Sequence, residues 1–122
     1  MKKKAFTLIE LLVVIAIISI LITVGSVSYI RAVRLSRDSK RKTDLEQIRQ
    51  ALETYRSETG AYPADTSLLV SNYITTLPTD PKTPSSSYEY TPAGSPATTY
   101  TLCASLETLD TYPNCNYPLT NP

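Results

Sequence analysis

The chain has 122 residues, enough for one modest domain with a single core. Its formal net charge is +1, but three lysines stand at positions 2–4, and from residue 59 onward only Lys82 opposes five acidic residues, Asp65, Asp80, Glu89, Glu107 and Asp110. The C-terminal half therefore has no electrostatic footprint of a nucleic-acid-binding domain, and the absence of histidine argues against a zinc site and imidazole catalysis.

The first predicted element is an apolar helix over residues 6–30. This stretch has no proline, and Gly25 is its only weak helix former. Twenty-five helical residues extend roughly 37 Å, which is enough to cross a bilayer. The lysines at 2–4 place the N-terminus in the cytoplasm and the remainder of the chain outside, according to the positive-inside rule.

The helix is expected to continue beyond residue 30 as an amphipathic segment. Apolar side chains recur there at steps of three and four residues, at Leu45, Ile48, Leu52 and Tyr55. Because no proline separates the two parts, we predict one continuous helix from residue 6 to about residue 58. Gly60 is suited to cap its C-terminus, and Pro63 prevents its resumption.

Short elements follow the long helix. Asp65, Thr66 or Ser67 can cap a short helix over 68–70, and the prolines at 78, 81 and 84 then enforce an extended loop. Alternation of tyrosine with polar residues predicts strands at 87–91 and 98–104, with the turn between them in 92–96. The expected sum is a small antiparallel sheet packed on the second half of the helix.

The opening residues carry the most specific motif of the chain. The basic run at 2–4 is followed by a small residue, Ala5, and then by Phe-Thr-Leu-Ile-Glu at 6–10, which leads into the apolar helix. Glu10 is unexpected in a simple anchor, because a carboxylate in an apolar segment opposes membrane insertion by about 2 to 3 kcal/mol. Through this motif the chain resembles the class III signal of type IV pilins and pseudopilins.

The resemblance implies that prepilin peptidase cuts the chain between Ala5 and Phe6 on the cytoplasmic face and methylates the new N-terminus of Phe6. Ala5 stands where glycine is usual in the family. The new amino group on Phe6 is a suitable partner for the Glu10 carboxylate of a neighbouring subunit, since charges attract strongly at low dielectric. The alternative for Glu10 is a carboxylate stabilised by the N-terminal dipole of its own helix.

A secretory signal peptide is the competing interpretation of the same stretch, because it also has a basic start and an apolar core. We favour the pilin interpretation, since the apolar run is long, no small-x-small cleavage site closes it, and Glu10 interrupts its beginning. The chain lacks the proline that often breaks the first helix of pilins, which leaves Gly25 as the place for local melting.

Similarity extends beyond the apolar segment. Residues 41–55 and 60–63 look like the helix end and turn of pseudopilins and small pilins, and residues 77–81 are similar to their Asp-Pro loop. The implied fold class is α+β, a type IV pilin-like long helix packed on a small antiparallel sheet. The implied organisation is a leader at 1–5, an apolar helix at 6–30, an amphipathic half at 31–60 and a head at 61–122.

The resemblance also raises the question of metal binding. Major pseudopilins of type II secretion hold calcium in their C-terminal loops, but Asp80, Glu107 and Asp110 form no recognisable ligand run here. We therefore predict no metal and no cofactor. No catalytic constellation is visible, so the chain is not expected to be an enzyme.

Two cysteines lie late in the chain, at 103 and 115. In an exported head a Cys103–Cys115 disulfide is favoured over two unpaired thiols, and it would hold the loop at 110–114 against the sheet. Nine tyrosines are present. Adhesion or electron transfer is possible for such residues, but packing is the favoured role for tyrosines at strands and helix ends.

These features predict a structural subunit of a type IV pilus-like filament, first a single-pass membrane protein and then part of an extracellular or periplasmic fibre. Expected partners are other copies of the chain, prepilin peptidase, the inner-membrane assembly platform with its ATPase, and membrane lipid before assembly. Nucleic acid is not expected from the charge. The alternatives are a pseudopilin of a type II secretion or DNA-uptake system and a monomeric membrane-anchored binding domain.

Overall fold

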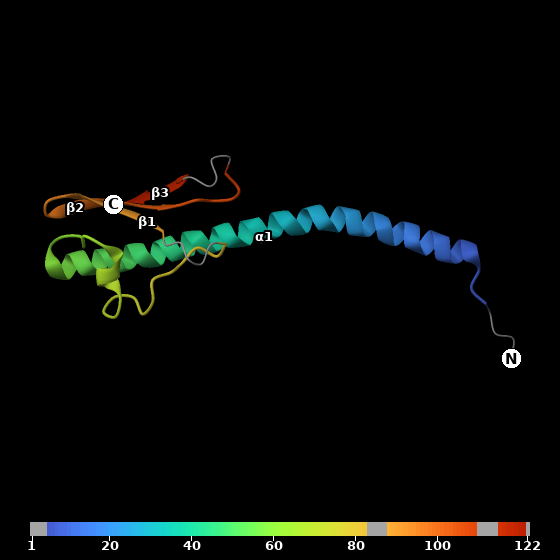
Figure 1. Ribbon diagram of the computed structural model, residues 1–122, viewed down its shortest axis with the longest axis horizontal. Helices are drawn as coiled ribbons and strands as arrows, with labels where there is room; N and C mark the ends of the chain where they lie inside the picture. The colour runs from blue at the N-terminus through green and yellow to red at the C-terminus, as the bar shows by residue number, and fades with distance from the viewer. Residues whose placement is uncertain (1–4, 83–87, 110–114, 122) are drawn as a thin grey trace. The chain divides into compact units, whose positions relative to one another are not determined.

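The computed structural model describes residues 5–82, 88–109 and 115–121. One long helix is followed by a short 3₁₀ helix and a three-stranded sheet (Figure 1). The elements are α1 (Leu8–Thr59), η1 (Thr66–Leu69), β1 (Glu89–Gly94), β2 (Ala97–Ala104) and β3 (Tyr117–Thr120). The chain divides into two compact units, residues 1–33, called the apolar unit, and residues 34–122, called the globular unit. This is the predicted α+β pilin-like arrangement.

Helix α1 agrees closely with its prediction from the sequence. It begins at Leu8, two residues after the expected start, and ends at Thr59, one residue after the expected end. Gly60 follows with a φ of 85°, and its amide donates to the carbonyl of Arg56 at 2.8 Å. A left-handed residue at this place is the usual helix C-cap, because glycine has no Cβ to oppose it.

The core of the globular unit lies between the second half of α1 and the inner face of the sheet. Leu45, Ile48 and Leu52, the predicted apolar face of α1, are no more than 1% exposed. They pack in one cluster with Tyr100 and Leu102 of β2. The period of three and four residues therefore did identify the buried face of the helix.

Helix η1 is capped as the sequence predicted. The carboxylate of Asp65 accepts the amide N–H of Ser67 at 2.7 Å, and the helix then buries Leu69 completely. A carboxylate at this position satisfies a backbone donor that the first helical turn leaves unpaired. The short helix therefore pins the start of the long loop to the core.

The sheet is antiparallel throughout, with β2 between β1 and β3. Strand β2 begins at Ala97, one residue before its predicted start, and ends where predicted, at Ala104. Strand β1 differs from its prediction, because it runs from Glu89 to Gly94. It therefore includes Pro92 and Gly94, which we had expected in the turn. Proline is tolerated in β1 because an edge strand leaves one row of backbone groups unpaired.

Strand β3 was missed by the sequence analysis. Its four residues include Pro118, which argues against a strand when only local preference is considered. In the fold β3 is an edge strand, with Leu119 opposite Leu102 and Pro118 opposite Cys103. The strand therefore forms because it pairs with β2, and its local sequence alone does not predict it.

Most tyrosines pack as predicted. Tyr62, Tyr88 and Tyr100 are at most 8% exposed, and the rings of Tyr62 and Tyr100 meet edge to face at 4.7 Å. Four others lie partly buried against the same core, Tyr55, Tyr73, Tyr90 and Tyr117. Tyr29, in the apolar part of α1, is 71% exposed.

Some predicted features lie outside the described residues. They are the first four residues of the leader, the start of the first strand at Ser87, and the loop at 110–114.

Candidate functional site

The predicted cleavage site lies just before α1. Ala5 and Phe6 are both exposed, with 82% of the Phe6 surface accessible. The helix begins two residues later, at Leu8. A cut between Ala5 and Phe6 would therefore leave the whole of α1 in the mature chain.

Glu10 caps the N-terminus of its own helix together with Thr7. The Glu10 Oε2 atom accepts the Thr7 amide at 2.8 Å and the Thr7 hydroxyl at 2.7 Å, while the Glu10 amide donates to Thr7 Oγ1 at 3.3 Å. This reciprocal arrangement is a capping box, whose Thr-x-x-Glu signature was visible in the sequence but not used. Among the described contacts, Glu10 Oε1 accepts no hydrogen bond.

The first half of α1 exposes nearly all of its apolar surface. From Phe6 to Ile30 the large apolar side chains are between 46% and 82% exposed. By length and composition α1 is able to cross a membrane, and none of its most apolar window is buried by the described residues. Such a surface is stable only against lipid or against other apolar helices.

Three hydroxyl groups within this apolar surface are satisfied by the helix itself. Ser19, Thr23 and Ser26 donate to the carbonyls four residues earlier at 2.7, 2.8 and 2.8 Å. Without these bonds, each hydroxyl would be unpaired in a hydrocarbon environment. These three hydroxyls therefore add no unpaired donor to the apolar surface.

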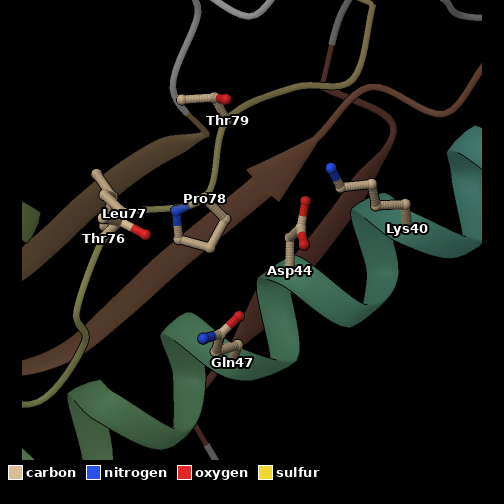
Figure 2. Close-up of a pocket in the computed structure, with 7 residues that line it drawn as sticks. All are labelled: Lys40, Asp44, Gln47, Thr76, Leu77, Pro78 and Thr79. Carbon is tan, nitrogen blue, oxygen red and sulfur yellow. The ribbon is translucent and has the colours of Figure 1, made fainter.

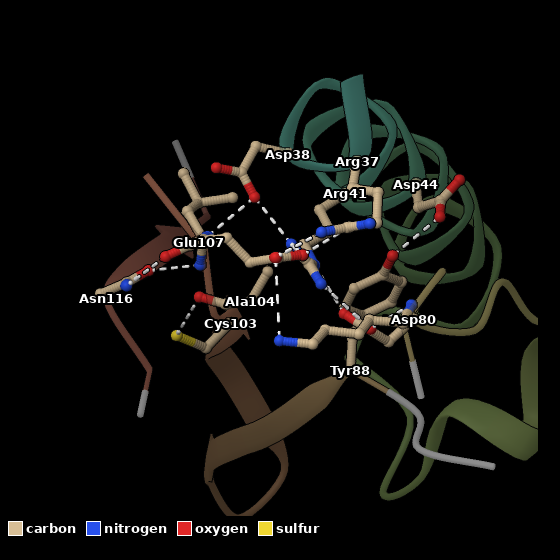
Figure 3. A network of polar contacts seen from close by, with 12 residues as sticks. Arg37, Asp38, Arg41, Asp44, Asp80, Tyr88, Cys103, Ala104, Glu107 and Asn116 are labelled. Carbon is tan, nitrogen blue, oxygen red and sulfur yellow. Dashed lines mark hydrogen bonds and ion pairs between the residues drawn. The ribbon is translucent and has the colours of Figure 1, made fainter. Parts of the chain in front are cut away.

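In the globular unit, a fully buried arginine organises the polar interior (Figure 3). Arg41 contacts Asp80 through Nε at 2.6 Å and Nη2 at 3.1 Å. Its Nη1 atom donates to Asp38 at 2.7 Å and to Glu107 at 3.1 Å. These hydrogen bonds raise the pKa of Arg41 still further above its ordinary value, with Asp80 as the largest contributor. One guanidinium thus joins α1 to the Asp-Pro loop and to the segment after β2.

The segment after β2 is held by two further side chains of α1. The Arg37 Nε and Nη2 atoms donate to the two carboxylate oxygens of Glu107 at 2.7 and 2.6 Å. Asp38 accepts the amides of Glu107 and Thr108 at 2.8 and 2.9 Å and the Thr108 hydroxyl at 2.7 Å. Asp38 therefore fixes the backbone of this segment, while Arg37 fixes its carboxylate.

Two of the three carboxylates considered as calcium ligands bind arginine, and the third, Asp110, lies outside the described residues. Asp80 and Glu107 both direct their oxygens at Arg41. Within residues 5–82, 88–109 and 115–121, no three His, Cys, Asp or Glu side chains are grouped to hold a metal ion.

A buried tyrosine completes the network. The Tyr88 hydroxyl donates to Asp44 Oδ2 at 2.7 Å, and Asp44 is 8% exposed. Burial, and then the neighbouring Asp44 carboxylate, raise the pKa of Tyr88 well above its ordinary value. The phenol therefore stays protonated and links β1 to α1.

These contacts predict an acid-sensitive globular unit. Hydrogen bonds from Arg37 lower the pKa of Glu107; for Asp38, burial raises the pKa, but hydrogen bonds from Thr108, Glu107 and Arg41 outweigh it and lower the pKa overall. A lowered folded-state pKa stabilises the fold above the unfolded value, and this stability is lost as the pH falls through the folded value.

We expect the free energy of unfolding to be level from pH 7 to about pH 5 and to fall below about pH 4, near the ordinary pKa of these groups. Urea unfolding of the full chain in detergent, followed by near-ultraviolet circular dichroism of the tyrosines, measures it. Level stability down to pH 3 would contradict this account.

The C-terminal segment is closed by a disulfide between Cys103 and Cys115, whose Cα atoms are 5.8 Å apart. Beside it, the Asn116 side chain accepts the Leu106 amide at 2.7 Å and donates to the Leu106 carbonyl at 2.9 Å. The amide group of Asn116 thus acts in place of a backbone pair and extends the contact between β2 and β3 (Figure 3). The bridge and Asn116 together hold β3 on the sheet.

Replacing both cysteines with serine is expected to lower the free energy of unfolding by about 3 kcal/mol, because the unfolded chain gains the freedom of an open loop. The same denaturation experiment checks this value. The intact protein should also be about 2 Da lighter before reduction than after it, because forming the bridge removes two hydrogens. Equal masses would show that no bridge forms.

Sequence reasoning did not find the Arg41 network. Arg37, Asp38 and Arg41 lie within one turn of an amphipathic helix and read as ordinary surface charges. Their partners, Asp80 and Glu107, are 39 and 66 residues from Arg41 in sequence, so spacing could not reveal the contacts. One available signal was that Asp38 and Arg41 lie close to the apolar stripe that begins at Leu45.

Comparison with known proteins identifies the family. Residues 1–26 match the model of the prokaryotic N-terminal methylation motif, and residues 27–117 match the model of type IV minor pilin ComP, DNA uptake sequence receptor. No curated protein and no solved structure matches the chain. Since the second match spans more than half of the chain and adjoins the first, the chain belongs to the type IV pilin family, as a member of the group described as type IV minor pilin ComP.

Proposed function

We propose that this chain is a structural subunit of a type IV pilus-like filament. The observation that carries the proposal is the long exposed apolar half of α1, which follows directly on the Phe-Thr-Leu-Ile-Glu motif. Lipid covers this surface before assembly, and the helices of neighbouring subunits cover it afterwards. The globular unit then forms the outer surface of the fibre.

Processing creates the group that directs assembly. Prepilin peptidase cuts after Ala5 and methylates the amino group of Phe6, and the assembly platform with its ATPase extracts the mature chain from the membrane. The Glu10 carboxylate then binds the positively charged amino group of a neighbour's Phe6. In the free subunit, Thr7 occupies Oε2 of Glu10, while Oε1 is available for this contact.

The capping box supports this role because it lowers the cost of keeping Glu10 in the membrane before assembly. Two donors from Thr7 satisfy one carboxylate oxygen that would otherwise lose its water. A neighbour's amino group then supplies the opposite charge at low dielectric, where an ion pair is strongest. The pair would set the axial register of adjacent helices.

The test is to determine the N-terminal residue and the mass of the protein recovered from membranes and from sheared surface material. A chain that begins at a methylated Phe6 and is present in the sheared fraction is the expected result. A chain that begins at Met1 and stays in membranes would instead indicate a monomeric anchored domain.

A second candidate function is DNA uptake, favoured by the description of the matching family model, which names a DNA uptake sequence receptor. Charge argues against a DNA-binding head in this chain. Residues 34–122 hold eight Lys and Arg against ten Asp and Glu, and two of these cations, Arg37 and Arg41, are bound by internal carboxylates. Tight DNA binding needs several cations that are free to meet phosphates.

The two functions are separated by the binding of duplex DNA to the full chain in detergent at a series of salt concentrations. We expect weak binding with a shallow salt dependence. Affinity in the nanomolar range at physiological salt, with a steep loss as salt rises, would favour the uptake receptor.

A role as a pseudopilin in secretion would leave the protein periplasmic and absent from sheared material.

A further inference from the structure

Most charged side chains among the described residues of the globular unit have a partner within it, and the exceptions are Arg34 and Lys40 on α1 and Glu89 on β1. Among the described residues, Lys40 on α1 has no ion-pair or hydrogen-bond partner, although Asp44 lies one turn further along the helix. The Asp44 carboxylate accepts instead from Tyr88. The exposed, unpaired amine of Lys40 beside a groove is therefore available to a carboxylate of another molecule.

The groove beside Lys40 lies between α1 and the loop before the Asp-Pro turn (Figure 2). Its volume is about 310 Å³, and its lining consists of Lys40, Asp44, Gln47, Thr76, Leu77, Pro78 and Thr79. In Figure 2 the helix residues project from successive turns of α1 toward the loop. This volume is at the lower end of the range for ligand sites, so the groove suits a protruding side chain better than a cofactor.

The matching carboxylate is Glu89 at the start of β1. Glu89 is exposed, while its neighbours Tyr88 and Tyr90 turn toward the core, so its side chain lies on the sheet face that points away from α1. No hydrogen bond or ion pair holds it among the described residues. Its partner on β2 is the uncharged Cys103, and the partner of Cys103 on β3 is the uncharged Pro118.

We infer that the groove at Lys40 receives Glu89 from a second copy of this chain, as a contact between neighbouring globular units. The inference rests on the proposed filament function. Lys40 supplies the charge, and Gln47, Thr76 and Thr79 supply hydrogen-bond donors around it. Each copy carries the cation and the carboxylate on different faces, so the contact is head-to-tail and leaves a free groove and a free Glu89 at the two ends. A head-to-tail contact extends into an open polymer when successive copies do not close into a ring.

The experiment is a charge exchange in the full chain, expressed beside the wild-type chain in a host that carries the machinery of type IV pilus assembly. Lys40→Glu and Glu89→Lys should each reduce the filament yield in the sheared fraction about tenfold, because like charges then meet at every interface. The double variant restores opposite charges in the reversed order. It should return to within about twofold of the wild-type yield.

Arg34→Glu is the matched control, because Arg34 is an exposed arginine on the same helix but does not line the groove. It should reduce the yield much less, and Arg34→Glu combined with Glu89→Lys should remain as low as Glu89→Lys alone. The amount of processed chain in membranes separates an assembly defect from a folding defect, since both target residues are exposed.

Two results would overturn the contact and leave the proposed function standing, provided that the wild-type chain forms filaments. One is a normal filament yield from Lys40→Glu, and the other is a double variant whose yield is no higher than that of either single variant. If the processed wild-type chain enters no filament, the proposed function itself fails, and the contact fails with it.

Discussion

Replacement of Glu10 with glutamine should abolish filaments while leaving leader removal intact. Glutamine keeps the size and most of the hydrogen-bonding capacity of the side chain, including an oxygen that can accept from Thr7. It loses the negative charge that binds the amino group of a neighbouring subunit. Losing one partner of an ion pair at low dielectric costs about 3 to 5 kcal/mol, so filament yield should fall more than a hundredfold.

Thr7→Val is the informative companion variant. It removes the hydroxyl that donates to Glu10 and also accepts its amide, but keeps the backbone donor and the carboxylate. If Glu10 served only as a helix cap, Glu10→Gln would keep that cap and would assemble at least as well as Thr7→Val. We expect filaments from Thr7→Val in reduced amount and none from Glu10→Gln.

Both effects are measured from the processed chain in membranes and in the sheared fraction. Leader removal is read from the N-terminal residue, so a variant that the peptidase no longer cuts is distinguished from one that fails to assemble. Normal fibres from Glu10→Gln would refute the pairing between subunits.

Arg41→Met should give the largest loss of stability in the globular unit. Methionine fills much of the volume of the arginine stem but leaves Asp38, Asp80 and Glu107 without their shared cation. Removing one partner from a buried ionic cluster is strongly destabilising, and we expect the free energy of unfolding to fall by about 3 to 5 kcal/mol. Urea unfolding of the full chain in detergent, followed through the tyrosines, measures the change.

Arg34→Met serves as its control, because Arg34 is an exposed arginine on the same helix. Its effect should lie within about 0.5 kcal/mol of zero. The loss in Arg41→Met should also shrink as the pH falls, since protonated Asp38 and Glu107 no longer need the cation. Equal stability of the two variants at pH 7 would show that the arginine contributes nothing to the fold.

Much of this architecture was predictable because it depends on residues that are close together in the sequence. The apolar run, the charge change near residue 31 and the stripe at Leu45, Ile48 and Leu52 specify a single helix and its buried face. Gly60 and Asp65 specify an end and a cap, since only a few residue types satisfy those backbone positions. Strand β2 was also found, because tyrosine and leucine alternate along it with threonine.

The sequence by itself thus determined the long helix, its apolar half, the family motif at its start and the central strand, because each depends on neighbours within a few residues. Only the tertiary structure decided the rest. Strand β3 forms because β2 pairs with it in an antiparallel ladder, although β3 contains Pro118. Arg41 became the centre of the polar interior because the fold brings Asp80 and Glu107 from distant segments to a place that water does not reach. Buried charges must find partners wherever the chain supplies them, and local pattern does not encode which partners those are.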